Sequence, residues 1–225
     1  MTATPGVSGS APLAPSPAEP DRDCPLCPRL VAFRHEWRAR EPSWHNAPVG
    51  NFGPQSARLL IVGLAPGLRG ANRTGRPFTG DYAGDLLYRT LLDFGFAKGR
   101  YEARPDDGLI LTDAMIANAV RCVPPENKPT PEEIRTCRRF LAPTISTLPN
   151  LRVILALGRI AHETTLGALE LRKTAFPFTH GAMHAVRPGL TLADSYHCSR
   201  YNTSTGVLTE EMFRAVFAAI GHELG

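Results

Sequence analysis

The sequence predicts an α/β fold: a three-layer αβα sandwich around a central, mainly parallel sheet of four strands. Two observations carry this prediction. Short apolar runs of the kind that form buried parallel strands alternate along the chain with segments of helical periodicity. Two of these runs end at a glycine, Gly63 and Gly158, where a loop or a helix begins. Such alternation builds βαβ units, which give a parallel sheet with helices on both faces.

The chain of 225 residues accommodates one such domain and not two large ones. Residues 1–22 are rich in Ala, Pro, Ser and Gly and contain few large apolar side chains. A segment of this composition cannot bury enough surface to offset its ordering entropy. We therefore expect a disordered tail over residues 1–22 and one folded domain over residues 23–225.

Four apolar runs are the expected strands. They cover residues 58–63, 109–112 leading into 115–118, 151–158 and 190–196. Ligands of open parallel sheets bind outside the carboxyl ends of the strands. Functional residues are therefore expected in the loops that follow these four runs.

Helices are expected between and around the strands. Apolar side chains recur at helical spacing over residues 27–40 and 86–94. Thr130 opens the clearest helix, as an N-cap followed by proline at the first helical position and glutamate at the third. Thr209 caps a final helix through Ala219.

The composition describes an ordinary globular protein with a mildly basic charge. The net charge of +4 permits a polyanionic partner without demanding one. Five cysteines are an odd count that fits poorly with a secreted disulfide framework. The sequence shows no signal peptide and no apolar stretch of membrane-spanning length. We therefore expect a cytoplasmic protein, and a monomer, with no membrane partner.

Four of the cysteines form two pairs on either side of a βα unit, Cys24-x2-Cys27 and Cys122-x14-Cys137. Thiolate ligands favour iron–sulfur clusters and zinc. A closed four-cysteine zinc site is usually built from two short knuckles, and only the first pair here is short. The spacing favours a [4Fe–4S] cluster, with zinc as the alternative and disulfides less favoured than either.

The loop after the first strand is the most distinctive in the sequence. Residues 63–67 lack the spacings of dinucleotide-binding and P-loop motifs, so a tight turn is their simplest interpretation. Residues 70–81 add two arginines, an aromatic ring and the carboxylate of Asp81, a mixture that can hold a phosphate and stack a base. Asp81 by itself is also explained as a helix N-cap.

Two further polar groups follow strands. Residues 197–203 read His-Cys-Ser-Arg-Tyr-Asn-Thr directly after the last strand. A single histidine is usually structural or exposed, but this dense polar patch at a strand end favours function. Asn118 follows the second strand, where it can also serve simply to bond its own backbone in a turn.

Taken together and in this order, five segments resemble the uracil-DNA glycosylase superfamily, and within its iron–sulfur branch they look like family 5, the type b enzymes. They are Cys24-x2-Cys27, residues 63–67, residues 72–81, Cys122-x14-Cys137 and residues 197–203. The resemblance runs from about Asp23 to the C-terminal helix. It implies a [4Fe–4S] cluster on the four cysteines and hydrolysis of the N-glycosidic bond of uracil in DNA, which starts base excision repair. It also implies tolerance of other deaminated bases, such as hypoxanthine, and of some etheno adducts.

Two departures from the superfamily pattern are informative. Leu64 stands where the related family 4 enzymes carry glutamate, so this loop supplies no water-activating group. Cys198 replaces the proline of the more common His-Pro-Ser motif, which leaves it as the cysteine outside the cluster.

The resemblance and the chemistry together suggest three catalytic residues. His197 is expected to donate a hydrogen bond to the departing base, as neutral imidazole or, more strongly, as imidazolium. Asn118 suits the pairing edge of uracil or the positioning of water. Asp81 is the candidate for orienting the attacking water; if it is only a helix cap, stabilisation of the leaving anion carries the reaction.

Gly63, Ala65 and Phe78 are expected in the base pocket with Asn118 and His197, Phe78 as the stacking ring. The candidate DNA contacts are Arg73, Arg76, Ser199, Arg200, Tyr201 and Asn202. Lys128 is a further candidate, explained equally well as solvated surface. We expect the cluster to be structural, because glycosidic hydrolysis transfers no electron.

Two other functions remain open from the residues themselves. The apolar pair Leu64-Ala65 is consistent with an iron–sulfur protein that binds nucleic acid without cutting it. A zinc-stabilised α/β hydrolase acting on a free nucleoside is the third possibility.

Overall fold

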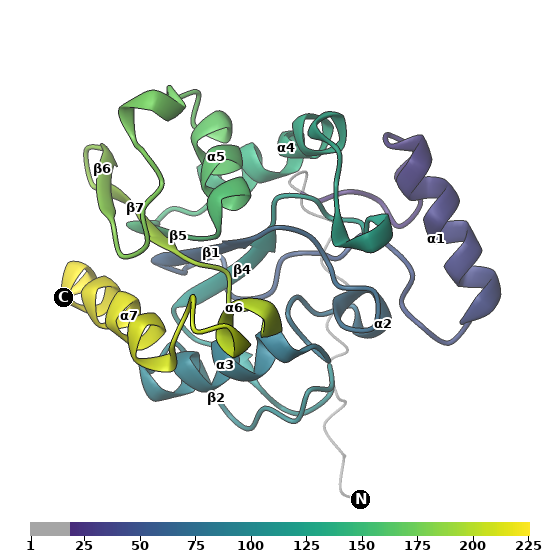
Figure 1. The fold of residues 1–225 in the computed structure, drawn as a ribbon, viewed down its shortest axis with the longest axis horizontal. Coiled ribbons are helices and arrows are strands. Elements are labelled where there is room, and N and C mark those ends of the chain that lie inside the picture. Colours follow the sequence, from purple (N-terminus) through teal and green to yellow (C-terminus); the bar gives the residue numbers. More distant parts are fainter. Residues whose placement is uncertain (1–18) are drawn as a thin grey trace, which may run out of the picture.

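A five-stranded sheet forms the centre of the computed structural model, which describes residues 19–225 (Figure 1). The strand order is β4–β1–β5–β7–β6. The strands are β1 (Leu59–Gly63), β4 (Ala114–Asn118), β5 (Val153–Leu157), β6 (Met183–Arg187) and β7 (Leu190–Ser195). Neighbours pair in parallel except for β6, which runs antiparallel to β7. The predicted mainly parallel α/β sheet is confirmed with one additional edge strand, while residues 1–18 of the predicted tail lie outside the described residues.

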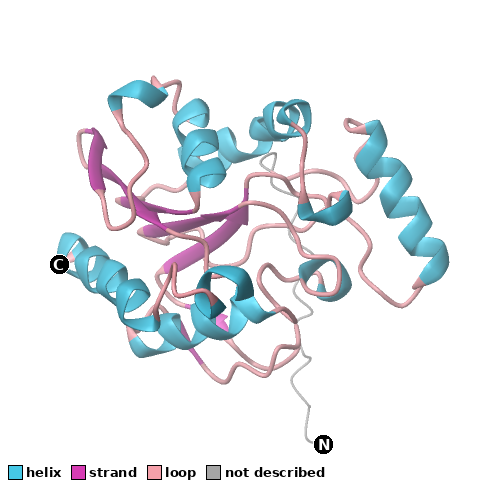
Figure 2. Ribbon diagram, in the orientation of Figure 1, coloured by secondary structure: helices cyan, strands magenta, loops and turns pink. Residues whose placement is uncertain are grey.

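Helices cover the sheet on both faces, as Figure 2 shows by colour. They are α1 (Pro28–Arg40), α2 (Ala71–Thr74), α3 (Tyr82–Asp93), α4 (Pro131–Ser146), α5 (Arg159–Ala168), α6 (Arg200–Ser204) and α7 (Glu210–Leu224). Two 3₁₀ turns, η1 (Pro125–Asn127) and η2 (Lys173–Ala175), complete the helical elements. Within residues 19–225, none of these helices combines the length and apolar character needed to cross a membrane.

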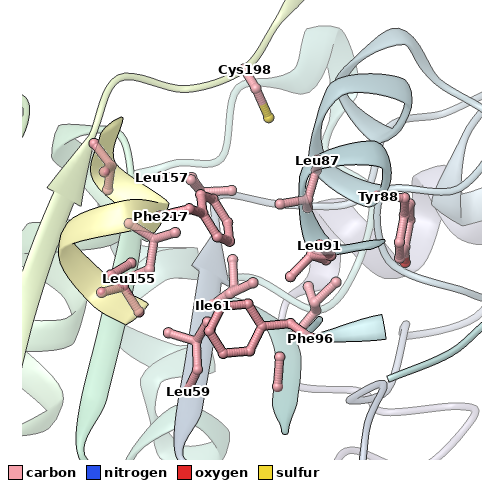
Figure 3. Close-up of a cluster of buried hydrophobic side chains, with 14 of the residues drawn as sticks. Leu59, Ile61, Leu87, Tyr88, Leu91, Phe96, Leu155, Leu157, Cys198 and Phe217 are labelled. Atoms are coloured by element: carbon pink, nitrogen blue, oxygen red, sulfur yellow. The ribbon is translucent and has the colours of Figure 1, made fainter. Parts of the chain in front are cut away.

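The sheet separates two apolar layers, because successive strand residues point to opposite faces. Leu59 and Ile61 of β1 belong to a cluster with α3 and α7, and Figure 3 shows Leu91 and Phe217 of these helices in it. Leu60 and the next alternate residues of the strands pack instead with α4 and α5. The central strands are buried throughout, which explains their uninterrupted apolar sequences.

The structure corrects the expected second strand. Residues 109–112 do not enter the central sheet; β3 (Ile110–Leu111) pairs with β2 (Ala97–Lys98) in a separate two-stranded ribbon. The sheet strand is β4, which begins after Asp113 and is buried throughout, whereas Ile110 is exposed. The edge strand β6 was not predicted, because it is only partly buried and its sequence mixes polar and apolar residues.

The predicted helix starts are confirmed. The Thr130 side chain accepts from the backbone N–H of Glu133, and the Glu133 carboxylate accepts from that of Thr130, a complete capping box. Thr209 caps α7, which continues to Leu224 rather than ending at Ala219. The segment of residues 70–81 in the loop after β1 contains the short helix α2.

Candidate active site and cysteine centre

A pocket of about 270 Å³ lies at the carboxyl ends of β1 and β4. Seven of the predicted site residues line it: Ala65, Phe78, Asp81, Asn118, His197, Ser199 and Arg200. They come from three stretches far apart in the sequence, which the parallel sheet brings to one edge. The location predicted from the strand ends is therefore the location of the pocket.

Gly63 shapes the pocket by the side chain it lacks. A Cβ atom on Gly63 would lie 2.5 Å from Asn118 Oδ1 and 2.6 Å from Phe78 Cζ, closer than real contacts allow. Phe78 itself has a left-handed backbone (φ 52°), an uncommon conformation for a bulky residue. The Tyr101 hydroxyl donates to the Phe78 carbonyl (3.3 Å), which helps to hold that conformation. Strained backbone of this kind occurs at functional sites, where it fixes the direction of a side chain.

Asn118 is the last residue of β4 and is 2% exposed. Its Oδ1 atom is buried and accepts no hydrogen bond from any group in the described part of the chain. A buried acceptor without a donor is destabilising, and most such groups in proteins have partners. The amide oxygen is therefore suited to receive an N–H group from a ligand in the pocket.

His197 faces Phe78 across the pocket, with ring centroids 5.9 Å apart and planes inclined by 28°. Burial lowers the pKa of His197 to about 4, so the ring is neutral near pH 7 and carries one N–H. The Asn202 side-chain amide donates to the His197 carbonyl (2.8 Å), and the Ser199 hydroxyl accepts from the Asn202 backbone N–H (3.4 Å). Asn202 therefore holds the loop of His197 from inside the protein.

Asp81 combines the two roles that the sequence left open. Its Oδ1 atom accepts from the Gly84 N–H (3.2 Å) and caps α3. The same carboxylate lines the pocket, and its Oδ2 atom lies so close to Gly70 that a Cβ there would approach it to 2.5 Å. Burial raises the pKa of Asp81, against the effect of its backbone hydrogen bonds.

One predicted DNA contact is wrong. Arg76 is 5% exposed, and its guanidinium donates to both carboxylate oxygens of Asp107 (2.8 Å each). It also lies against the rings of Tyr88 and Tyr101. A buried, fully engaged arginine cannot reach a phosphate, and the sequence offered no sign of Asp107 as its partner.

The other polar candidates are placed at the surface. Arg200 lies over the ring of Tyr82 (5.1 Å) at the pocket rim, and Tyr201 is 72% exposed beside it. Arg73 is exposed on α2. Lys128 is exposed and lies 3.4 Å from a carboxylate oxygen of its neighbour Glu126, which favours the interpretation as solvated surface.

Some pocket residues were not predicted. Tyr82 and Asn127 both line the pocket, the first from α3 and the second from η1. Asn127 follows Glu126 in a left-handed conformation (φ 57° and 55°), which ends the turn at the pocket. Asparagine is enriched in that conformation, but nothing in the sequence directs this turn toward the pocket.

The four paired cysteines meet in a second cavity, which residues of α1 help to line. Cys24, Cys27, Cys122 and Cys137 all line it, whereas Cys198 is buried elsewhere and donates to the Ala83 carbonyl (3.5 Å). Burial and the neighbouring thiols raise the pKa of Cys27 to about 11 and of Cys122 to about 12. Burial makes ionisation of Cys27, Cys122 and Cys137 unfavourable, and a bound cation would favour their thiolate forms.

Cys27 is the N-cap residue of α1, yet its side chain makes no capping hydrogen bond and remains free for ligation. The Arg121 backbone N–H donates to Cys137 Sγ (3.2 Å). Hydrogen bonds to the sulfur atoms are typical of sites that hold soft metals through thiolates. The residues present therefore fit a four-thiolate metal centre.

A buried histidine–aspartate group was missed by the sequence reasoning. His162 Nδ1 lies 2.7 Å from Asp194 Oδ1, and His184 Nε2 lies 3.3 Å from Asp194 Oδ2. The second nitrogen of His162 faces the Phe176 carbonyl at 2.9 Å. Both nitrogens of His162 thus face acceptors, and bonding to Asp194 raises the pKa of His162 against the effect of burial. Nothing in the local sequence brings these three residues together.

The sequence was compared with known proteins. Residues 50–221 match the family model of the uracil DNA glycosylase superfamily. The chain is 51% identical to the type-5 uracil-DNA glycosylase of Thermus thermophilus, over 86% of this chain and 90% of that protein. It is 40% identical to the type-5 enzyme of Mycobacterium tuberculosis, over 86% and 75% of the two chains. A type-4 uracil-DNA glycosylase of Archaeoglobus fulgidus is 32% identical over 61% of this chain.

Proposed function

The chain belongs to the uracil-DNA glycosylase superfamily, and from that membership we propose that it hydrolyses the N-glycosidic bond of uracil in DNA, the first step of base excision repair. The observation that carries the proposal is the buried, unpartnered amide oxygen of Asn118 at the strand-end pocket. The N3–H group of uracil is a donor of the kind that this oxygen lacks.

Base selection follows from the same atom. Cytosine presents an acceptor at N3, which would leave the Asn118 oxygen without a donor or repel it. The free energy of this mismatch favours uracil over cytosine. Hypoxanthine carries an N–H at the equivalent position of its pairing edge. This shared feature supports activity on other deaminated bases, as the resemblance to family 5 implied.

The base reaches the pocket only by leaving the helical stack. Flipping costs about a few kcal/mol and is easiest for a mismatched base such as uracil opposite guanine. Phe78 offers its ring for stacking, and Gly63 leaves the space that the ring and the Asn118 amide occupy. Base–aromatic stacking contributes about 1–3 kcal/mol, enough to offset much of that cost.

In the reaction, the bond between C1′ and N1 breaks and its electron pair stays on the base. The resulting anion is delocalised onto the carbonyl oxygens, where the N–H of neutral His197 stabilises it. One donor placed on a developing oxyanion typically contributes about a hundredfold to a thousandfold in rate. The sequence left open whether His197 acts as neutral imidazole or as imidazolium, and its low pKa favours the neutral form.

Water forms the new bond to C1′. The Asp81 carboxylate lies in the pocket, accepts the hydrogen bond of that water and takes up its proton. Its negative charge also favours the positive character that develops on the sugar. Oδ1 is held by the α3 cap, so the carboxylate is fixed in direction and Oδ2 is the atom available to water.

DNA is held around the pocket rim. Arg73 on α2 and Arg200 at the pocket are the proposed phosphate contacts, and Ser199 lines the pocket next to Arg200. Tyr201 is exposed at the start of α6 and is proposed to enter the gap that the flipped base leaves. Asn202 supports this loop through the hydrogen bond to the His197 carbonyl and stays a candidate DNA contact.

The cysteine centre is proposed to hold a [4Fe–4S] cluster rather than zinc. Four thiolates on one zinc ion lie roughly 3.8 Å apart, given a Zn–S distance of about 2.3 Å. Among the described residues, only His162, His184 and Asp194 bring three ligand atoms within 4.8 Å of one another. No three of the cysteine sulfur atoms therefore lie that close together, and their spacing is wider than the spacing around one zinc ion. A cubane cluster needs that wider spacing. When bound, it supplies cross-linking of distant segments, and no step of hydrolysis uses it. A monomeric, cytoplasmic protein remains our expectation.

The decisive experiment is a single-turnover assay on oligonucleotides that carry uracil, hypoxanthine, xanthine or cytosine at one position, single-stranded and mismatched. Alkali cleavage of the abasic product reports excision. We expect excision of uracil and hypoxanthine and none of cytosine. Binding of the uracil oligonucleotide without excision would establish the non-catalytic alternative instead, and activity on free deoxyuridine would establish the nucleoside hydrolase.

A further inference from the structure

Two arginines that line the cysteine cavity are buried without a carboxylate partner. Arg34 is 3% exposed and Arg121 is fully buried. The third buried arginine among the described residues, Arg76, has an anion, Asp107. Among residues 19–225, neither Arg34 nor Arg121 forms a salt bridge; Asp23 acts on Arg34 and Glu19 acts on Arg121 only at longer range.

The hydrogen bonds of both side chains are incomplete among the described residues. Arg34 donates from Nη1 to Cys122 Sγ (3.8 Å) and from Nη2 to the Cys24 carbonyl (3.1 Å), and its buried Nε has no partner in the described chain. Arg121 donates from its guanidinium to Asn51 and Thr144, both neutral, and its Nε is likewise unpartnered.

An isolated guanidinium cannot relieve this situation by losing its proton, because arginine stays charged in proteins. Burying such a charge without an anion is strongly destabilising. Neutral thiols or disulfides at the four cysteines would leave both charges uncompensated. Four thiolates around an oxidised cubane core carry about two net negative charges, which match the two arginines.

We infer that Arg34 and Arg121 are the counter-charges of the iron–sulfur cluster: they neutralise its thiolate shell, retain it in the protein and raise its reduction potential. This inference rests on the proposed cofactor. A positive charge beside a cluster favours the more negative, reduced state, so each arginine makes the bound cluster easier to reduce.

Arg34 is the residue to test, because Arg121 is fully buried and also holds Asn51 and Thr144. Arg34→Met removes the charge and keeps most of the side-chain volume, while Arg34→Lys retains the charge. Arg40→Met is the matched control: it removes a positive charge from the same helix at a 62% exposed side chain. Anaerobically purified proteins are assayed for iron and sulfide, for loss of visible absorbance in the presence of a chelator, and for the one-electron midpoint potential at an electrode.

We expect Arg34→Met to retain iron roughly 10- to 100-fold more weakly, the range typical of lost partners of metal ligands, and to have a more negative midpoint potential. Arg34→Lys should resemble the wild-type protein in potential, and Arg40→Met in both properties. Complete loss of cluster from Arg34→Met, with recovery in Arg34→Lys, also supports the charge role.

Equal iron retention and potential in Arg34→Met and Arg40→Met would overturn the inference, as would loss of the cluster from Arg34→Lys as well. A wild-type protein without iron and sulfide would overturn the proposed cofactor and the inference together. A wild-type protein that holds the cluster but excises no uracil would overturn the proposed activity alone.

Discussion

At the scale of single residues, the pocket depends on glycines, whose lack of a side chain leaves room for neighbouring groups. Gly63 leaves room for the Asn118 amide and the Phe78 ring. Gly84 does the same for the backbone of Phe78, because a Cβ there would lie 1.8 Å from the Phe78 carbonyl oxygen. Asp81 bonds the N–H of that same Gly84. The aromatic ring and the carboxylate are therefore placed by one tight turn.

Asp81→Asn separates the catalytic role of Asp81 from its role as a cap. Asparagine is as good an N-cap as aspartate, so the stability of α3 should change little. The side chain loses its charge and its capacity to take a proton, so the single-turnover rate on uracil-containing DNA should fall by roughly a hundredfold or more. The measurement is single-turnover excision together with the thermal unfolding midpoint.

Asp85→Asn, an exposed acid on the same helix, is the control and should leave the rate unchanged. The wild-type rate should decline at acid pH, because the carboxylate must be ionised and its pKa lies above the usual 3.8. That acid limb should be absent in Asp81→Asn. If Asp81→Asn kept the wild-type rate, the role of Asp81 would be limited to capping α3.

At the scale of elements, hydrogen bonds to one carboxylate fasten the sheet edge in addition to its apolar packing. Asp194 on β7 accepts hydrogen bonds from His162 on α5 and His184 on β6, and from the Thr179 N–H in the loop between them (3.3 Å). These bonds join β6, which is only partly buried, to the rest of the fold. A neutral His162 would place a ring lone pair against an acceptor.

The stabilisation at this edge should therefore depend on pH. The pKa of His162 is raised in the folded protein above 6.5, its unfolded value. Its contribution is fully present below that unfolded pKa and is lost as the pH rises through the folded pKa. The free energy of unfolding, measured from about pH 6 to pH 9, should fall more steeply for the wild-type protein than for His162→Gln.

The two proteins share every other titratable group, so the comparison isolates His162. His222→Gln, at an exposed position of α7, is the control and should follow the wild-type curve. Parallel curves for the wild-type protein and His162→Gln would show that His162 is neutral in the folded state.

Elements governed by local rules were predictable. Thr130 opened a helix because its cap, proline and glutamate act within one turn. The buried runs of β1 and β5 were recognisable because parallel strands are apolar on both faces. The partner of Arg76 was not predictable, because Asp107 is 31 residues away in the sequence and only the tertiary structure brings the two together. Nothing local directed the turn of Asn127 toward the pocket, and β6 was missed because it is only partly buried and mixes polar and apolar residues.

At the scale of the whole molecule, the cysteine centre fastens a peripheral segment to the sheet domain. Figure 1 shows α1 at the edge of the molecule, beyond the helices that cover the sheet. Only Leu30 and Arg34 of this helix are buried, and Leu30 packs with Cys137 and Val120. So small an apolar contact leaves α1 dependent on what the cysteines hold.

Removal of the cluster should therefore loosen one region and spare another. After treatment with a chelator, amide hydrogen exchange should accelerate over residues 19–40 and 121–137, while β1, β4 and β5 keep their protection. Cys137→Ser should behave like the chelated protein. Cys198→Ala, which removes the thiol outside the centre, should retain full iron content. Uniform acceleration across the sheet would instead make the centre part of the global core.

The four cysteines are also synthesised at different times during translation. Cys24 and Cys27 leave the ribosome before β1, α3 and β4 have been made, and Cys137 follows after 113 further residues (137 − 24). At about 5–20 residues per second, this interval lasts on the order of ten seconds. During it the first two thiols are exposed and incomplete as a binding site. Insertion of the proposed cluster thus becomes a late step of biosynthesis, after Cys137 has been made.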